Sequence, residues 1–456
     1  MITGKIRRYY KENFGEILQT TFNPNGPGSI RIHLIPPKAG DKTQSSLIMV
    51  NGRDILPCNE YWTVMLAEFI KEVNAFDGIP VTDEILDGIY ERAFQSTKAV
   101  IPFLSRKRFE ETIRRIVHTF KQLSVGEVPD EDIQWVTIGE YADYMSAPHR
   151  MDVMVSAMVK DGSWHCNQKC VHCYAAGQNY AEERELTTEQ WKRVLDKCRE
   201  AGIPQITFTG GEPTMREDLC ELIAYARWFV SRLNTNGIRL TPEYCEDLRR
   251  AELDGLQITL YSGDESIHNT LVGAAQYRNT VAGIKNSLAA GLNPSINTPL
   301  CTLNRDYVKT LEFLHALGVT YVTCSSIIVT GRAETETSQS MQLQIPELKQ
   351  ILTEAVDYAF ANGMEIGFTS PGWLENDYFR ELSIPAPNCG ACLSNMAVTP
   401  GGNVVPCQSW LSGNVLGNIL TDNWEDIWYS AFCKKRREYS SLMLGRCPLR
   451  KGRGGI

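Results

Sequence analysis

Strand-like runs alternate with helical segments through the middle of this chain. Five runs rich in β-branched and aromatic residues read QITFTGG (205–211), FVSRLNTNG (229–237), LDGLQITLYSG (253–263), NPSINTPLC (293–301) and VTYVTCSSIIVTG (319–331). Helical segments such as TVAGIKNSLAAGL (280–292) and VKTLEFLHALG (308–318) separate them. Strands that alternate with helices imply parallel β/α units. In such folds ligands bind at the carboxyl ends of the strands, so we expect the functional site there.

The composition is that of an ordinary globular protein. The chain of 456 residues is 43% hydrophobic and 22% charged, which suggests two to four domains of roughly 100 to 200 residues each. A net charge of -8 gives no electrostatic reason to expect a nucleic-acid partner. No apolar run approaches the roughly 20 residues that cross a bilayer, and residues 1–15 lack the apolar stretch of a signal peptide. We therefore expect a cytoplasmic protein without a membrane partner, in which the 14 cysteines stay reduced.

Three cysteines lie close together in the segment WHCNQKCVHCYA (164–175). They are Cys166, Cys170 and Cys173. A structural zinc ion usually takes four protein ligands, often as two separate pairs, so three clustered thiols fit it poorly. A cubane iron-sulfur cluster held by three thiolates keeps one iron free to bind something else. The neighbouring His165 and His172 leave a mixed Cys/His zinc site as the alternative.

A loop of sequence GGEP (210–213) follows the first of the strand-like runs. Together with the C-x3-C-x2-C spacing it resembles the radical S-adenosylmethionine (SAM) family. The resemblance implies that the fourth iron is chelated by the amino and carboxylate groups of SAM, and that Gly210, Gly211, Glu212 and Pro213 receive the amino group. Glycines let the backbone approach a ligand closely, and a carboxylate or backbone carbonyl accepts from an ammonium group.

The same resemblance sets the fold and the chemistry that we expect. The β/α pattern then indicates six units, an α/β fold with a partial (β/α)6 TIM-like barrel over residues 151–370. The third and fourth strand ends imply SAM contacts at Asn236 and Thr259, the latter with the ribose, whereas a turn Asn and a strand Thr are the structural alternatives. The cluster cleaves SAM to methionine and a 5'-deoxyadenosyl radical, which abstracts hydrogen from unactivated carbon. An external electron donor such as flavodoxin or ferredoxin would supply the electron.

A second group of cysteines follows the proline-rich break ELSIPAPN (381–388). Residues 389–410 read CGACLSNMAVTPGGNVVPCQSW, with hairpin glycines at the tip. With VLGNILTDNWEDIW (415–428) this resembles the SPASM or Twitch extension of peptide-modifying radical SAM enzymes. A full SPASM extension has a later dense cysteine block, which this chain lacks. Over residues 371–456 we therefore expect one auxiliary [4Fe-4S] cluster, and a structural zinc ion is the alternative. The expected ligands are Cys389, Cys392, Cys407 and Cys447, with Cys433 a weaker candidate because its helical context suggests the core.

The first 125 residues contain β-rich segments and then three helical runs. The β-rich segments are SIRIHLIPP (29–37) and SSLIMVNGRDILP (45–57). This order resembles the α+β domains called RiPP recognition elements, which implies that a leader peptide adds a strand to an exposed sheet edge. We expect that edge at residues 45–52 and a linker over residues 126–150. An accessory domain that only packs on the barrel is the alternative.

Taken together, these resemblances imply a radical SAM maturase of a ribosomally synthesised precursor peptide. The expected product is a thioether or carbon-carbon crosslink, and backbone excision or epimerisation are alternatives. Cys324 is a candidate hydrogen-atom donor for an epimerase, or a buried structural cysteine. Two other classes stay open, which are a sulfatase-maturing-type protein oxidase and a non-enzymatic zinc-binding scaffold.

Overall fold

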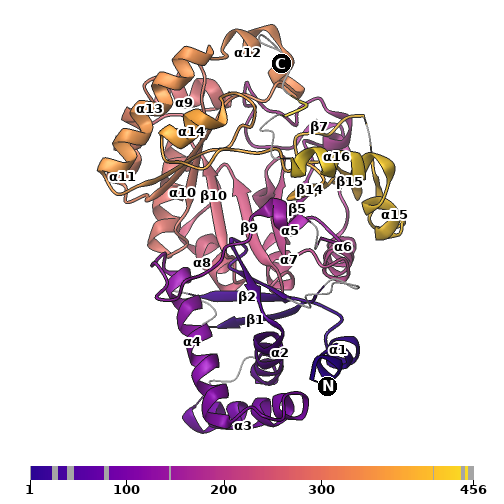
Figure 1. Cartoon of the computed structure of the whole chain (residues 1–456). Helices are drawn as coiled ribbons and strands as arrows, with labels where there is room; N and C mark the ends of the chain where they lie inside the picture. The colour runs from indigo at the N-terminus through magenta and orange to yellow at the C-terminus, as the bar shows by residue number, and fades with distance from the viewer. Residues whose placement is uncertain are drawn as a thin grey trace. The chain divides into compact units, whose positions relative to one another are not determined.

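The computed structural model describes residues 2–22, 29–37, 46–76, 82–142, 145–413, 415–442 and 447–449. The chain forms two compact units, Met1–Met145 and Ser146–Ile456 (Figure 1). All 14 cysteines are free thiols. Within the described ranges, no helix combines the length and the apolar character that crossing a membrane requires.

The N-terminal unit is an antiparallel sheet with helices packed against it. The strands lie in the order β1 (Leu18–Phe22), β2 (Ile30–Ile35), β3 (Ser46–Val50) and β4 (Asp54–Cys58). The helices are α1 (Ile2–Asn13), α2 (Glu60–Asn74), α3 (Asp83–Val100), α4 (Arg106–Ser124) and the short α5 (Ile138–Tyr141). The side chains of Asn59, Thr82 and Ser105 cap the starts of α2, α3 and α4 by accepting from backbone N–H groups. One hydrophobic core joins the sheet to α2, α3 and α4.

The expectation that residues 45–52 form an edge strand is wrong for the residues that the structure describes there, from Ser46 onward. Strand β3 lies between β2 and β4, so that Ile48 faces Leu34 on one side and Leu56 on the other. All five residues of β3 are buried. A continuous apolar run indicates burial on both faces of a strand, but it does not tell an inner strand from an outer one. The outer strands of this sheet are β1 and β4.

The second unit is built on one ten-stranded sheet. Its parallel strands β5 (Arg150–Ser156), β8 (Gln205–Gly210), β9 (Val230–Thr235), β10 (Gly255–Thr259), β11 (Ser295–Pro299) and β12 (Tyr321–Ser325) are neighbours in this order and form the six expected units. The helices α6 (Thr188–Glu200), α7 (Leu219–Tyr225), α8 (Pro242–Arg250), α9 (Glu265–Val272), α10 (Tyr277–Ala289) and α11 (Tyr307–Ala316) connect them. After α12 (Glu336–Ser340) and α13 (Ile345–Ala361), β13 (Glu365–Phe368) adds a seventh parallel strand beside β12. The partial barrel is therefore confirmed.

The C-terminal extension continues the barrel sheet. Strand β14 (Asn395–Val398) pairs in parallel with β5, on the side opposite to β8, and β15 (Asn403–Val405) and β16 (Gly417–Asn418) follow it in antiparallel pairing. Glu183 of the barrel accepts from the side chains of Thr399 and Asn403 and from the backbone N–H of Gly401 at the hairpin tip. The remaining helices are α14 (Asn376–Glu381), α15 (Trp424–Trp428) and α16 (Ala431–Ser441). The extension is thus fixed to the first barrel strand by backbone pairing.

The inner position of β3 can be tested with proline. Ile48→Pro removes one backbone donor from a strand that pairs on both sides, whereas Ile48→Ala removes only the side chain. We expect the proline variant to lose about 1–3 kcal/mol more of the free energy of unfolding than the alanine variant, because a buried carbonyl of the neighbouring strand is left without its donor. Hydrogen-deuterium exchange should show this loss of stability as weaker protection of the backbone amides of residues 46–58. Equal protection in the two variants would contradict an inner β3.

Candidate functional site

The cysteine loop after β5 has almost no secondary structure of its own. Other segments hold its backbone instead, since Lys169 and Val171 donate to the carbonyls of Val272 and Leu271 at the end of α9, at 2.9 Å each. On the other side, Arg332 in the short helix η4 (Gly331–Glu334) donates from its backbone to Cys173 O at 3.0 Å and from its side chain to Cys170 O at 3.2 Å. The loop is therefore shaped by tertiary contacts.

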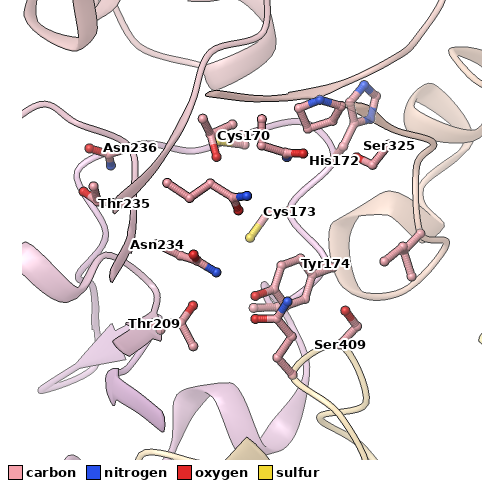
Figure 2. Close-up of a pocket in the computed structure, with 18 of the residues that line it drawn as sticks. Cys170, His172, Cys173, Tyr174, Thr209, Asn234, Thr235, Asn236, Ser325 and Ser409 are labelled. Atoms are coloured by element: carbon pink, nitrogen blue, oxygen red, sulfur yellow. The ribbon is translucent and has the colours of Figure 1, made fainter. Parts of the chain in front are cut away.

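The three thiols of this loop share one cavity of about 450 Å³ at the carboxyl ends of the strands. Figure 2 shows Cys170 and Cys173 among polar side chains that come from different strands. Burial raises the pKa of Cys166 to about 12 and also raises the pKa values of Cys170 and Cys173, while the positive charge of Arg332 opposes the rise. Thiols that stay protonated in the absence of metal become thiolates when iron binds them, because the cation stabilises the charged form.

The donor set fits a cluster better than a single ion. In the described part of the chain, no three His, Cys, Asp or Glu side chains close on one metal position. A cubane cluster binds each thiolate at a different iron, so its ligands need not converge on one point. Of the two neighbouring histidines, His172 has its Nδ1 2.6 Å from Ser338 Oγ, whereas His165 Nε2 lies 3.8 Å from a carboxylate oxygen of Glu185, beyond hydrogen-bond distance. Burial lowers the pKa of His172 to about 4.

Both glycines of the GGEP loop are required by close contact with the end of β5. A Cβ atom on Gly210 would lie 2.3 Å from the carbonyl oxygen of Ser156, and one on Gly211 would lie 2.8 Å from that of Ala157. Gly210 also has φ +144°, which side chains rarely adopt. The carbonyl of Gly211 lies 3.4 Å from the Cys166 sulfur, so the loop reaches the cysteine loop directly.

The carboxylate of Glu212 is used inside the protein. It is fully buried and accepts from the backbone and hydroxyl of Thr214, from the hydroxyl of Thr235 at 2.6 Å and from the backbone N–H of Asn236 at 2.8 Å. Burial raises its pKa, and these hydrogen bonds oppose the rise. Pro213 is buried at the start of the short helix η3 (Pro213–Met215) and does not line the cavity. Gly210, Gly211 and Glu212 of this loop line the cavity.

Asn236 and Thr259 lie where the sequence places them, at the ends of neighbouring strands on the cavity. The Asn236 amide donates to Asn167 Oδ1 at 2.6 Å, and its own oxygen accepts from Ile238 N at 3.1 Å. It therefore ties the end of β9 to the cysteine loop. Cys324 and Ser325 are adjacent on β12, so their side chains point to opposite faces of the sheet. Ser325 lines the cavity, whereas Cys324 does not. This favours the structural alternative for Cys324.

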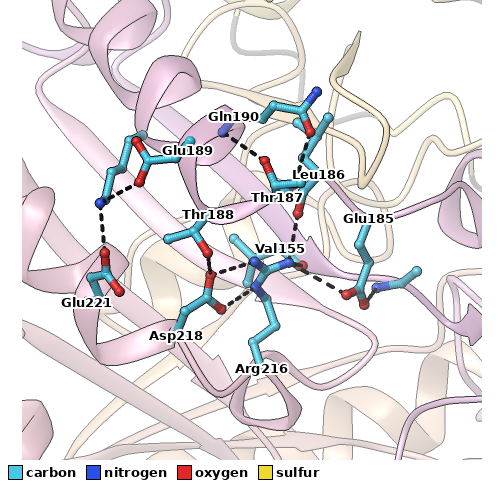
Figure 3. A network of polar contacts seen from close by, with 12 residues as sticks. Val155, Glu185, Leu186, Thr187, Thr188, Glu189, Gln190, Arg216, Asp218 and Glu221 are labelled. Atoms are coloured by element: carbon cyan, nitrogen blue, oxygen red, sulfur yellow. Dashed lines mark hydrogen bonds and ion pairs between the residues drawn. The ribbon is translucent and has the colours of Figure 1, made fainter.

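A buried arginine holds the base of these loops (Figure 3). Arg216 donates to the carbonyls of Val155 and Leu186 at 3.1 Å each and forms an ion pair with Asp218 at 2.7 Å. Thr188 donates to the same carboxylate at 2.6 Å. Burial raises the pKa of Asp218, but the bonds from Arg216 and Thr188 outweigh it and hold the pKa below its usual value. The network links the segment after β8 to the end of β5.

Five thiols gather in the extension, where four were expected. Cys389 is in hydrogen-bonding reach of Cys447, which lowers the pKa of Cys389 to about 6, and Cys392 is in the same relation to Cys433, which lowers the pKa of Cys433. Burial raises the pKa of Cys407 to about 12, and its charge acts on Cys392 and Cys447. Cys433 is buried in α16, as its helical context suggested, and it also joins the other thiols.

Several site residues escaped the sequence-based predictions. Tyr261 lines the cavity beside the Cys170 thiol, and the positive charge of Arg332 acts on all three thiols of the cysteine loop. Gln178 joins the two thiol groups of the protein, because its side chain donates to Tyr174 O and Ser409 O and accepts from Leu411 N. These residues act across long separations in sequence, so no local motif marks them.

The glycine contacts give a direct test of the loop. Gly210→Ala places a methyl group against Ser156 O and should weaken SAM binding more than tenfold, because β5 and β8 must separate. Gly291→Ala is the matched control, since Gly291 also has positive φ, +74°, but nothing lies within 4 Å of the added atom. We expect the control to cost about 1–2 kcal/mol in stability, because alanine is disfavoured at positive φ, and to keep SAM affinity. Equilibrium dialysis with labelled SAM measures both, and equal affinity in the two variants would contradict the close contact.

Comparison with known proteins matches residues 165–343 to the radical SAM superfamily and residues 389–448 to SPASM, an iron-sulfur cluster-binding domain. The PqqA peptide cyclase of Streptomyces rochei is 28% identical over 286 residues, 60% of this chain and 76% of that protein. The AdoMet-dependent heme synthase of Methanosarcina barkeri is 27% identical over 306 residues, 62% of this chain and 85% of that protein.

A solved structure of Streptococcus suis SuiB bound to the precursor peptide SuiA has a similar fold. The TM-score is 0.60 with 15% sequence identity, and the alignment covers 94% of this chain and 96% of that one. The two matched family segments contain the three thiols of the cysteine loop and the five of the extension. The chain is therefore a member of the radical SAM superfamily that carries a SPASM iron-sulfur cluster-binding domain.

Proposed function

We propose that this protein cleaves SAM reductively and uses the resulting radical to modify a ribosomally synthesised precursor peptide. The observation that carries the proposal is the single cavity on which the cysteine loop, the GGEP loop and the polar strand ends all open. A cluster bound there supplies the electron that breaks a carbon-sulfur bond of SAM. The electron itself would come from an external donor of the flavodoxin or ferredoxin type.

The residues of the cavity divide into cluster ligands and SAM contacts. Cys166, Cys170 and Cys173 hold the cluster, and Arg332 offsets the negative charge that three thiolates bring. Because the Glu212 carboxylate is already bonded to its own loop and to β9, a backbone carbonyl of the GGEP loop receives the SAM amino group. Thr259 contacts the ribose, and Asn236 positions the cysteine loop through Asn167.

The wall of the cavity favours a peptide as the substrate. Neutral hydroxyl and amide side chains dominate the strand ends, and the extension adds two more polar groups. These residues are Thr209, Asn234, Gln257, Thr259, Asn297, Ser325, Thr369, Gln408 and Ser409. Such groups donate to and accept from main-chain amides without requiring a charge on the substrate. The bond formed, a thioether or carbon-carbon crosslink, stays a prediction.

Similarity to the two relatives does not decide in favour of a peptide substrate, and the support for a peptide comes from the N-terminal unit. Those relatives match about 60% of the chain and are named for a peptide and for heme. The likeness to SuiB covers 94% of the chain and so must include the fold of the N-terminal unit, which spans Met1–Met145. We propose that this unit holds the leader peptide as an added strand on β1 or β4, its two outer strands.

In both outer strands, some of the backbone hydrogen-bonding groups are already bonded or are missing. On β4, Pro57 lacks an N–H donor, and the Ile55 carbonyl accepts from Val136 N at 3.0 Å. On β1, the Gln19 carbonyl accepts from the Asn74 side chain at 2.7 Å. A proline at Thr21 of β1 or at Ile55 of β4 therefore tests the two edges separately.

Iron content tests the cluster assignment. The anaerobically reconstituted protein should hold about eight irons, four for each cluster. Changing Cys166, Cys170 and Cys173 together to alanine should leave about half of that iron and abolish formation of 5'-deoxyadenosine under a chemical reductant. A triple variant that still forms 5'-deoxyadenosine would contradict the assignment. About four irons with stoichiometric zinc in the parent protein would indicate zinc in the extension.

Leader binding tests the role of the N-terminal unit. Deleting residues 1–145 should weaken binding of a labelled precursor peptide at least tenfold. Slow SAM cleavage without peptide should persist, because the cavity lies wholly within the second unit. One of the variants Thr21→Pro and Ile55→Pro should reproduce the deletion in fluorescence anisotropy. Equal affinity in all four proteins would exclude the unit as the recognition element and favour a sulfatase-maturing type of enzyme.

A further inference from the structure

Two adjacent arginines of α16 contact two different thiols of the extension. Arg436 donates from Nη2 to the Cys389 sulfur at 3.4 Å, and Arg437 donates from Nη1 to the Cys433 sulfur at 3.5 Å. Both side chains are half-buried, whereas the preceding Lys434 and Lys435 are exposed. These two arginines are therefore hydrogen-bonded to sulfur, unlike the two exposed lysines of the same helix.

Aromatic rings hold each guanidinium in place. Arg437 lies 3.8 Å from the centre of the Trp428 ring and also donates to the Trp428 carbonyl at 3.3 and 3.4 Å. Arg436 lies 4.2 Å from the centre of the Tyr439 ring. Stacking on an aromatic face fixes the plane of the guanidinium and therefore the direction of its donors.

Arg436 carries further donors besides the one on Nη2. Its Nε is buried and has no hydrogen-bond partner among the residues that the structure describes. A buried donor without a partner costs about 1–3 kcal/mol, so it is usually satisfied by something. The acceptors that an iron-sulfur cluster brings, thiolate and sulfide sulfurs, would satisfy it beside Cys389.

We propose that Arg436 and Arg437 raise the reduction potential of the auxiliary cluster. The inference rests on the presence of that cluster in the SPASM domain and not on the identity of the substrate. One-electron reduction adds a negative charge that spreads over the cluster sulfurs. Fixed N–H donors and positive charge stabilise the reduced form more than the oxidised form, which raises the potential. The two arginines tune the cluster and hold its ligands, and they do not touch the substrate.

The test measures the auxiliary cluster alone. In the Cys166→Ala, Cys170→Ala, Cys173→Ala background, the remaining spectroscopic signal belongs to the extension. Redox titrations followed by electron paramagnetic resonance would compare this parent with Arg436→Gln, Arg437→Gln, Arg436→Lys and the exposed control Lys435→Gln. For each glutamine variant of an arginine, the ratio of oxidised to reduced cluster at a fixed potential should rise about tenfold, which is a midpoint lower by about 59 mV for one electron.

The other variants separate hydrogen bonding from net charge. Arg436→Lys keeps the charge but loses the fork of donors, so its midpoint should fall between those of the parent and Arg436→Gln. Lys435→Gln should titrate like the parent. An unchanged midpoint in both arginine-to-glutamine variants would overturn the proposal, and so would a shift of the same size in Lys435→Gln. If Arg436→Gln retains less iron, the midpoint of Arg436→Lys on its retained cluster decides the outcome.

Discussion

The buried carboxylate of Glu212 fixes the geometry on which the rest of the site depends. Burying an ionised carboxylate is costly, and here four hydrogen bonds from Thr214, Thr235 and Asn236 offset that cost. The bonds join the loop after β8 to the end of β9. Asn236 then extends the connection to Asn167 in the cysteine loop. A loop without secondary structure of its own thus has a defined position relative to the barrel.

The extension and the barrel share one sheet, which is why both thiol groups belong to one compact unit. Strand β14 pairs with β5, the strand from which the cysteine loop departs. Backbone pairing permits far less motion than a flexible linker. Glu183 at the hairpin tip and Gln178 behind the cysteine loop add side-chain bonds across the same boundary. One sheet and these side-chain hydrogen bonds therefore join the two groups of thiols.

Positive charge is distributed unequally between the two thiol groups. Arg332 donates to carbonyl oxygens of the cysteine loop. Its positive charge acts on the thiols electrostatically, without a hydrogen bond to sulfur. Arg436 and Arg437 bond to sulfur directly. Because hydrogen bonds to sulfur and local charge both set cluster potentials, two clusters in such different surroundings need not share one potential.

Local patterns in the sequence determined the parallel β/α units, the C-x3-C-x2-C loop and GGEP, because each depends on spacing within a short segment. Only the tertiary structure decided that Cys433 joins the extension thiols, that Cys324 faces away from the cavity and that the Glu212 carboxylate is used internally. It also placed β3 inside its sheet. An apolar run has the same pattern in an inner and in an outer strand, so the sequence does not distinguish the two positions. These outcomes depend on which distant segment packs against each residue. The pairing of β14 with β5 and the approach of α16 to Cys389 join residues that no spacing along the chain relates.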